Sequence, residues 1–319
     1  MGGGGAFHTY LGFGKIMASI YHYTSGSALL GIISNSEFWA TDINFLNDQQ
    51  EHVFGYGACV EYVKDLMDKE DHPDFADPLK LLYQQLINAS ERNVIERQTY
   101  IVSFSKKSDS IAHWFSYCEK NQGYCIEFEE DTFFDVENEK ALSGIFMSFE
   151  DVNYADSIKF SAGLGKVISR DSILSSMLDA QKTASKLKIN VQDENNKHAE
   201  NFLFKICNEL MRGLLGRMII SSCSYKGEGF IHESERRLML VENEMTPKGD
   251  SKTPKTKFRE RNGAIFPYMS IGFNKHSIKS ILIGPCSDYE FKRAGLLKLL
   301  KAQGIQCEVK RSASSLRFT

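Results

Sequence analysis

The segment SIYHYTSGSALLGIISNSEFWATDI, residues 19–43, predicts a strand, a helix and a second strand in succession. Its first six residues are rich in the aromatic and β-branched types that strands favour. Ser25 can then cap a helix whose apolar positions are Leu29, Leu30, Ile32 and Ile33. Residues 37–43 return to a strand pattern, so the chain begins with alternating strand and helix.

The remaining sequence places strands toward both ends and helices between them. Helices are expected from Asn47, with Gln50 at the capping-box position, around Leu79 to Ile87, around Trp114, and over 201–218 and 288–303. Strands are expected at 99–105, 123–129, 220–226, 235–242, 265–273, 278–284 and 305–310. This order predicts an α+β fold with a largely antiparallel core. We expect one elaborated domain over 17–319, with a polar insertion at 155–200 and a flexible segment at 1–16.

Composition limits the class of protein. The chain has 319 residues and a net charge of −3, which argues against a surface built throughout to coat nucleic acid or anionic membrane. Its seven cysteines form no CxxC pair, so neither a disulfide framework nor a zinc ribbon is expected. No stretch approaches the roughly 18 apolar residues of a membrane span. These features predict a cytoplasmic protein without a membrane partner.

Two acidic residues in IHESERRLML, residues 231–240, form the main candidate site. Glu233 and Glu235 are two apart at the expected start of a strand, which would direct both carboxylates to one face. Their mutual repulsion requires a cation or a ligand, and Arg236 or Arg237 could supply the cation. The competing interpretation is a solvated strand edge with an ordinary salt bridge. His22, in the first strand, is the second candidate, although a strand histidine alone is more often structural.

Six motifs in this order resemble a bacterial domain family of unknown function within the ADP-ribosyltransferase superfamily. They are YHYT (21–24), FLND (45–48), SFS (103–105), WFSYCEKNQGYCIEFE (114–129), ESERR (233–237) and IKSILIGP (278–285). The resemblance spans about residues 19–315. It implies split antiparallel β-sheets with flanking helices and NAD bound in the cleft between two small sheets. Several members are toxins, some in phage defence, including the toxin of CmdTAC-type toxin–antitoxin–chaperone systems, which modifies messenger RNA.

The resemblance also implies roles for individual residues. Glu235 matches the catalytic glutamate and Glu233 completes its E-x-E form, while His22 matches the histidine that binds a ribose hydroxyl of NAD. Tyr23 and Thr24 adjoin that histidine. Two alternatives remain for the residues that would contact nicotinamide. They are either the aromatic residues Trp114 or Tyr117, or the serines Ser103 and Ser105 of the strand expected at 99–105. An antitoxin and a chaperone are the implied partners, and the 155–200 insertion is a candidate docking element.

The reaction itself requires such residues. Cleavage of the nicotinamide–ribose bond passes through an oxocarbenium-like state, which a carboxylate near the ribose stabilises. With NAD as the substrate that the resemblance implies, we expect Glu235→Gln to fold normally but lose activity. No metal is expected, because His232 lacks a second histidine at i+4.

The acceptor of ADP-ribose is expected to be a macromolecule, with RNA or DNA ahead of protein. The segment TPKGDSKTPKTKFRER, residues 246–261, carries Lys255, Lys257, Arg259 and Arg261, which could follow a phosphate backbone while Phe258 stacks on a base. The alternative interpretation of this segment is a solvated loop. An NAD glycohydrolase and a non-catalytic binding module on the same fold also remain alternatives.

Overall fold

The computed structural model describes residues 18–46, 50–69, 79–80, 82–84, 86–88, 99–118, 123–135, 145–154, 169, 171, 218, 220–242, 255–261 and 263–314. The chain divides into two compact units, and each is described by itself. The first unit contains residues 1–36, 106–138 and 272–319, and the second contains residues 37–105 and 139–271.

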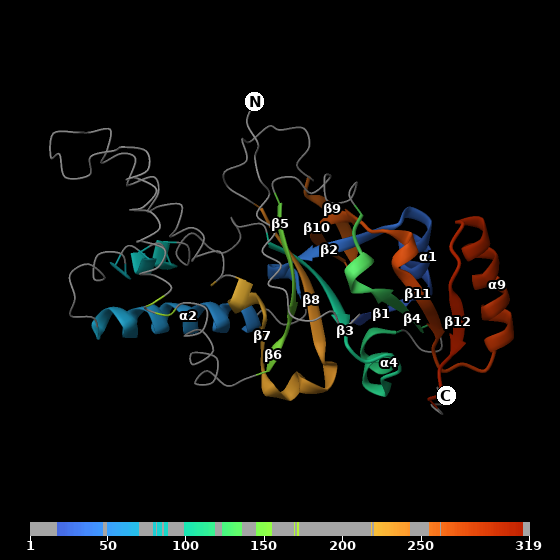
Figure 1. Ribbon diagram of the computed structural model, residues 1–319, viewed down its shortest axis with the longest axis horizontal. Helices are drawn as coiled ribbons and strands as arrows, with labels where there is room; N and C mark the ends of the chain where they lie inside the picture. Colours follow the sequence, from blue (N-terminus) through green and yellow to red (C-terminus); the bar gives the residue numbers. More distant parts are fainter. Residues whose placement is uncertain are drawn as a thin grey trace. The chain divides into compact units, whose positions relative to one another are not determined.

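The first unit has four neighbouring strands in the order β12-β11-β4-β1 (Figure 1). These are β1 (Ser19–Ser25), β4 (Gly123–Glu129), β11 (Ile278–Ile283) and β12 (Glu308–Arg311). β1 pairs antiparallel with β4, and β4 pairs antiparallel with β11. β11 and β12 run parallel, which requires a crossover connection, and helix α9 (Tyr289–Ala302) supplies it.

Two further helices of the first unit follow the predicted pattern. α1 (Gly26–Asn35) begins after Ser25, whose side chain accepts a hydrogen bond from the backbone N–H of Ala28. This confirms the predicted cap. α4 (Ile111–Tyr117) precedes β4. The unit's core is apolar, and Ile20, Ile126 and Ile281 of three neighbouring strands are fully buried.

The second unit is also mostly antiparallel. Its main strands are β2 (Glu37–Asp42), β3 (Thr99–Ser105), β5 (Ile145–Asp151), β8 (Glu235–Glu242), β9 (Lys257–Arg261) and β10 (Ala264–Gly272). β8 lies between β3 and β5 and pairs antiparallel with both. β9 pairs only with β10 among the described strands, and β10 neighbours β2. Short β6 (Asn153–Tyr154) and β7 (Tyr225–Lys226) form a separate parallel pair.

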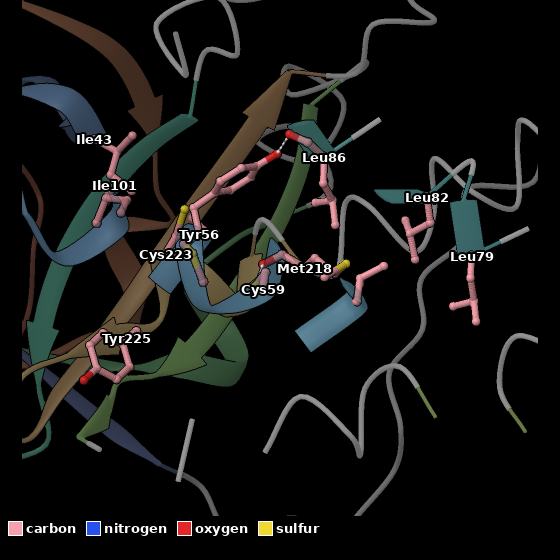
Figure 2. Close-up of a cluster of buried hydrophobic side chains, with 12 residues drawn as sticks. Ile43, Tyr56, Cys59, Leu79, Leu82, Leu86, Ile101, Met218, Cys223 and Tyr225 are labelled. Carbon is pink, nitrogen blue, oxygen red and sulfur yellow. Dashed lines mark hydrogen bonds between the residues drawn. The ribbon is translucent and has the colours of Figure 1, made fainter. Parts of the chain in front are cut away.

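Helix α2 (Gln50–Asp68) contributes one side of a buried apolar cluster in this unit (Figure 2). Cys59 and Val63 of the helix are fully buried there with Leu82 and Leu86, which belong to the predicted helical segment after Pro78. The hydroxyl of Tyr56 donates a 2.7 Å hydrogen bond to the carbonyl of Leu86, as Figure 2 shows. A buried tyrosine hydroxyl needs such a partner.

The α+β class is confirmed, together with the predominance of antiparallel pairing. One predicted strand, 220–226, is wrong over most of its length. Residues 220–223 are helical and only Tyr225–Lys226 form a strand. A short apolar run fits a buried helix end as well as a strand, so its periodicity could not separate them.

Three strands were not predicted: β5, β6 and β9. The expected cap at Asn47, the insertion at 155–200 and the helix at 201–218 lie outside the described residues, apart from Ser169, Asp171 and Met218. The prediction of one domain over 17–319 stays a prediction. Among the described residues, no helix combines the length and apolar character needed to cross a membrane.

Candidate functional site

The corner between β7 and β8 determines where the two candidate glutamates lie. After Lys226 the chain forms a short 3-10 helix, η4 (Glu228–Glu233), and Ser234 then adopts a left-handed conformation with φ of 44° before β8 begins. Glu233 is therefore the last residue of η4, and only Glu235 belongs to the strand. The prediction that strand alternation alone directs both carboxylates to one face is wrong, because the left-handed turn at Ser234 separates them.

Both carboxylates nevertheless meet at one cation. The ammonium Nζ of Lys226 lies 2.7 Å from Oε2 of Glu233 and 3.3 Å from Oε2 of Glu235. Arg237 donates to both carboxylate oxygens of Glu235, with Nε 2.8 Å from Oε1 and one terminal nitrogen 3.0 Å from Oε2. We call these four residues the ion cluster. Of the two predicted arginine partners, Arg237 fulfils the role, whereas Arg236 pairs with Asp151.

The ion cluster is almost entirely withdrawn from water. Its four side chains are between 3% and 10% exposed. Burial opposes ionisation of Glu235, but the charge of Arg237, the hydrogen bond from its guanidinium and the charge of Lys226 outweigh burial. Together with a hydrogen bond from the hydroxyl of Ser103, they lower the pKa of Glu235 to about 2. Glu235 is thus held as a carboxylate at any physiological pH.

Neighbouring polar groups fix the backbone of the same corner. The phenol oxygen of Tyr154 accepts a 2.6 Å hydrogen bond from the backbone N–H of Glu235. The hydroxyl of Ser105 donates to the carbonyl oxygen of Glu233 at 2.8 Å. Burial raises the pKa of Tyr154 to about 12, so its hydroxyl stays protonated. Both predicted serines of β3 therefore touch the predicted glutamates, one at the side chain and one at the backbone.

Apolar side chains of η4 lie beside the ion cluster. The Lys226 ammonium stands 4.7 Å from the centroid of the Phe230 ring, a cation–π contact. Phe230 is 38% exposed and Ile231 is 63% exposed, although both are large apolar residues. These two exposed side chains give η4 an apolar surface to which another molecule could bind.

Lys226 and Tyr154 are site residues that the sequence analysis missed. Lys226 occurs in SYKGEGF and Tyr154 in DVNYADS, and neither segment contains a motif. The one useful signal for Lys226 was chemical: two adjacent carboxylates require more positive charge than one arginine supplies.

The first-strand candidates lie in the other unit. Thr24 is 5% exposed, and its carbonyl accepts a hydrogen bond from the thiol of Cys118. Tyr23 is 8% exposed, and its hydroxyl donates to the carbonyl of Lys107 and accepts from the backbone N–H of Ser110, both at 2.9 Å. His22 is partly buried at the centre of β1, opposite Ile126 of β4.

The two aromatic candidates of α4 differ in exposure. Trp114 is 1% exposed, and its indole Nε1 donates a 2.7 Å hydrogen bond to Asp109. Its ring contacts Tyr23 edge to face, with the centroids 4.8 Å apart. Tyr117 is 41% exposed. Of this pair, Tyr117 is the exposed residue, whereas Trp114 supports Tyr23 from the core.

The basic candidates lie on or beside strand β9 rather than in a loop. Lys255 precedes the strand and is exposed. Lys257, Arg259 and Arg261 alternate along β9 and so share one face, while Phe258 projects from the opposite face. The expectation that Phe258 supplies the stacking surface beside these cations is therefore wrong. Among the described residues, no group of three potential metal ligands comes together.

Comparisons with known proteins identify one related region. Residues 113–238 match a family described as a protein of unknown function, DUF2971. The match includes α4 from His113 onward, β4, β5 and the whole ion cluster. No curated protein and no solved structure matches the chain.

Proposed function

We propose that this protein is an NAD-dependent ADP-ribosyltransferase, a toxin of phage defence that transfers ADP-ribose to a macromolecule. One observation carries the proposal: Glu235 is kept ionised at the start of β8, beside Glu233 and within reach of the Ser103 hydroxyl. The six motifs that resemble the ADP-ribosyltransferase superfamily include both glutamates and both serines of β3. The split antiparallel architecture of that superfamily belongs to the same proposal.

The chemistry needs a fixed negative charge. As the C1′–N bond breaks, its electron pair leaves with nicotinamide, which departs neutral, and positive charge develops on the ribose. The Glu235 carboxylate would stabilise that charge, and Glu233 would receive the proton that the acceptor loses on attacking C1′. His22, with Tyr23 and Thr24, would orient the NAD ribose, and Tyr117 would pack on nicotinamide. The leaving group needs no general acid.

The biological setting follows the resemblance to CmdTAC-type systems. The toxin would act in the cytoplasm, and an antitoxin and a chaperone would restrain it. Water is the alternative acceptor, which would make the protein an NAD glycohydrolase.

A second candidate function is a non-catalytic binding module. Both carboxylate oxygens of Glu235 already contact Arg237, and Lys226 adds a third ion pair. A glutamate so fully engaged is also typical of a buried network that fixes a corner of a fold. In that case Phe230 and Ile231 would form part of the binding surface, and NAD would not be cleaved.

The release of labelled nicotinamide by wild type and Glu235→Gln distinguishes these functions. Loss of this electrostatic contact should lower the rate about 10²–10³-fold. The matched control is Glu228→Gln, because Glu228 is an exposed glutamate on η4, and it should cleave NAD at the wild-type rate. NAD turnover by Glu235→Gln within a few-fold of wild type would exclude the transferase. Glu235→Gln also loses the buried ion pairs of Glu235, so we expect it to be less stable than wild type. Rates should therefore be compared well below the Tm of each variant.

The role of His22 has its own test. His22→Ala should weaken NAD binding, measured by calorimetry, because the histidine is proposed to hold a ribose hydroxyl. An unchanged affinity would contradict that role.

The acceptor can be identified by incubating the protein with labelled NAD and a cell lysate. Label removed by nuclease identifies nucleic acid, and label that survives nuclease but disappears with protease identifies protein. Label found only in free ADP-ribose identifies water as the acceptor.

A further inference from the structure

One face of the β2-β10-β9 strands combines cations with aromatic rings, and all of its residues lie in the second unit. We call it the β9 face. It consists of Trp39 and Thr41 on β2, Lys257, Arg259 and Arg261 on β9, and Tyr268 and Ser270 on β10. Two hydrogen bonds link these side chains: Lys257 donates to the Ser270 hydroxyl, and Arg259 donates to the Thr41 hydroxyl at 2.8 Å.

The cations of the β9 face have no acidic partner in the part of the chain that the structure describes. Among the described residues, no carboxylate forms an ion pair with Lys257, Arg259 or Arg261. Glu260 lies between Arg259 and Arg261 in the same strand, so alternation directs its side chain to the opposite face. Glu37 alternates onto the same side of β2 as Trp39, so the face holds three positive charges and one negative charge. It is electrostatically suited to an anion.

Arg259 is the most informative of the three cations. Its guanidinium stands 5.6 Å from the Trp39 ring and 5.7 Å from the Tyr268 ring, and its Nε is buried with no hydrogen-bond partner among the described residues. Burial, followed by the charge of Arg261, lowers the pKa of Arg259. A buried unpaired donor beside a second cation is costly unless an acceptor arrives.

The rings provide a second kind of contact. Trp39 is 45% exposed although its ring packs against Tyr268 with centroids 4.8 Å apart. Phe266, opposite Arg259 on β10, packs against Phe45, which is 38% exposed. A supported indole with one open side, next to a guanidinium, is suited to stacking against a planar group.

A role in solubility explains only part of this surface. Cations on an edge strand discourage pairing with another chain, and this accounts for exposed Lys257 and Arg261. It does not account for Arg259, which is half-buried against two rings and whose Nε has no hydrogen-bond partner within the described ranges. An anionic, planar ligand accounts for both.

We propose that the β9 face binds single-stranded nucleic acid, with phosphates at Lys257, Arg259 and Arg261 and a base stacked on Trp39. Single strands offer unstacked bases to aromatic side chains, whereas a duplex keeps its bases stacked on one another. The further step, that the bound nucleic acid is the acceptor of ADP-ribose, rests on the proposed function. Binding to the face requires no NAD.

Fluorescence anisotropy with a 12-nucleotide labelled RNA and its DNA equivalent, without NAD, tests the proposal. The wild type should bind the single strand at least tenfold more tightly than a duplex of the same sequence. The double variant Lys257→Glu/Arg261→Glu should weaken binding at least tenfold and flatten the salt dependence by about 1.4 in slope, since each phosphate contact on a single strand contributes about 0.7. Trp39→Ala should weaken binding roughly tenfold with an unchanged slope.

The matched control is Arg293→Glu/Lys298→Glu, which reverses two exposed cations on α9 and should bind like wild type. Thermal unfolding of each variant confirms that the fold is retained. Equal affinity of wild type and Lys257→Glu/Arg261→Glu would overturn the proposal, as would duplex binding as tight as single-strand binding. Displacement of the labelled nucleic acid by equimolar polyglutamate would overturn the proposal and would instead identify an acidic protein partner. Nicotinamide release without nucleic acid tests the transferase separately, so the two proposals can fail independently.

Discussion

Two short charged segments of the second unit, ESERR at 233–237 and KFRER at 257–261, differ in charge balance and in environment: the first has two acidic and two basic residues, the second one acidic and three basic residues. The strand that begins within ESERR lies between β3 and β5, and the cations and carboxylates there neutralise one another in the buried ion cluster. KFRER forms β9, which pairs only with β10 among the described strands, and its cations have no acidic partners there.

The difference follows from strand position. A central strand presents its side chains to neighbours on both sides, so every buried charge must be paired inside the protein. An edge strand has one open side, where a charge can remain hydrated or wait for a ligand. Charge paired within the protein therefore indicates structure or a preorganised site, whereas unpaired charge beside rings indicates recognition.

The largest expected effect comes from breaking the ion cluster. Arg237→Met should lower the free energy of unfolding by about 3–5 kcal/mol, because Glu235 would keep a buried charge without its main partner. Urea denaturation measures this. The matched control is Arg236→Met: its partner Asp151 is 54% exposed, so the loss should be below about 1 kcal/mol.

If Arg237→Met lowers the free energy of unfolding no more than Arg236→Met does, the ion cluster is hydrated. The contrast drawn between buried ESERR and exposed KFRER would then have no basis. Adding Glu235→Leu to Arg237→Met should recover part of the stability, since it replaces an unpaired buried charge with an apolar side chain.

Acid should destabilise the same cluster by a smaller amount. The pKa of Glu235 falls from an ordinary 4.5 to about 2 on folding, so its stabilising contribution is complete above pH 4.5 and is lost as the pH falls toward 2. The whole contribution is about 3 kcal/mol. The free energy of unfolding, measured by urea denaturation between pH 5 and 2, should fall more steeply with decreasing pH for wild type than for Glu235→Gln. Parallel profiles would contradict the assignment.

The sequence predicted the strands and helices whose periodicity was clear, such as β1, α1 and β4. It failed where a short segment has no decisive period. Residues 220–223 turned out to be helical, and β9 follows a proline-containing stretch that resembles a loop. Whether such a segment joins a sheet depends on a partner strand, and local sequence does not contain that information.

The candidate site could be predicted in part for the same reason. The need of Glu233 and Glu235 for a cation followed from Coulomb repulsion, and Arg237 is such a cation. Lys226 could not be predicted, because it reaches both carboxylates only through the reversal at Ser234. Phe258 was placed beside the basic residues by proximity in sequence, but strand alternation sends it to the other face.

The smallest expected effect separates the two segments most directly. Arg259→Met removes a hydrogen bond to Thr41 and two cation–π contacts, each contributing about 0.5–1.5 kcal/mol. It also removes a buried unpaired donor and the repulsion from Arg261, which offset that loss. The free energy of unfolding should therefore change by less than about 1 kcal/mol, measured by urea denaturation beside Arg237→Met. If Arg259→Met lowers the free energy of unfolding as much as Arg237→Met does, Arg259 stabilises the fold, and the β9 face no longer differs from the ion cluster in this respect. If Arg259→Met is neutral, the guanidinium is kept for something other than stability.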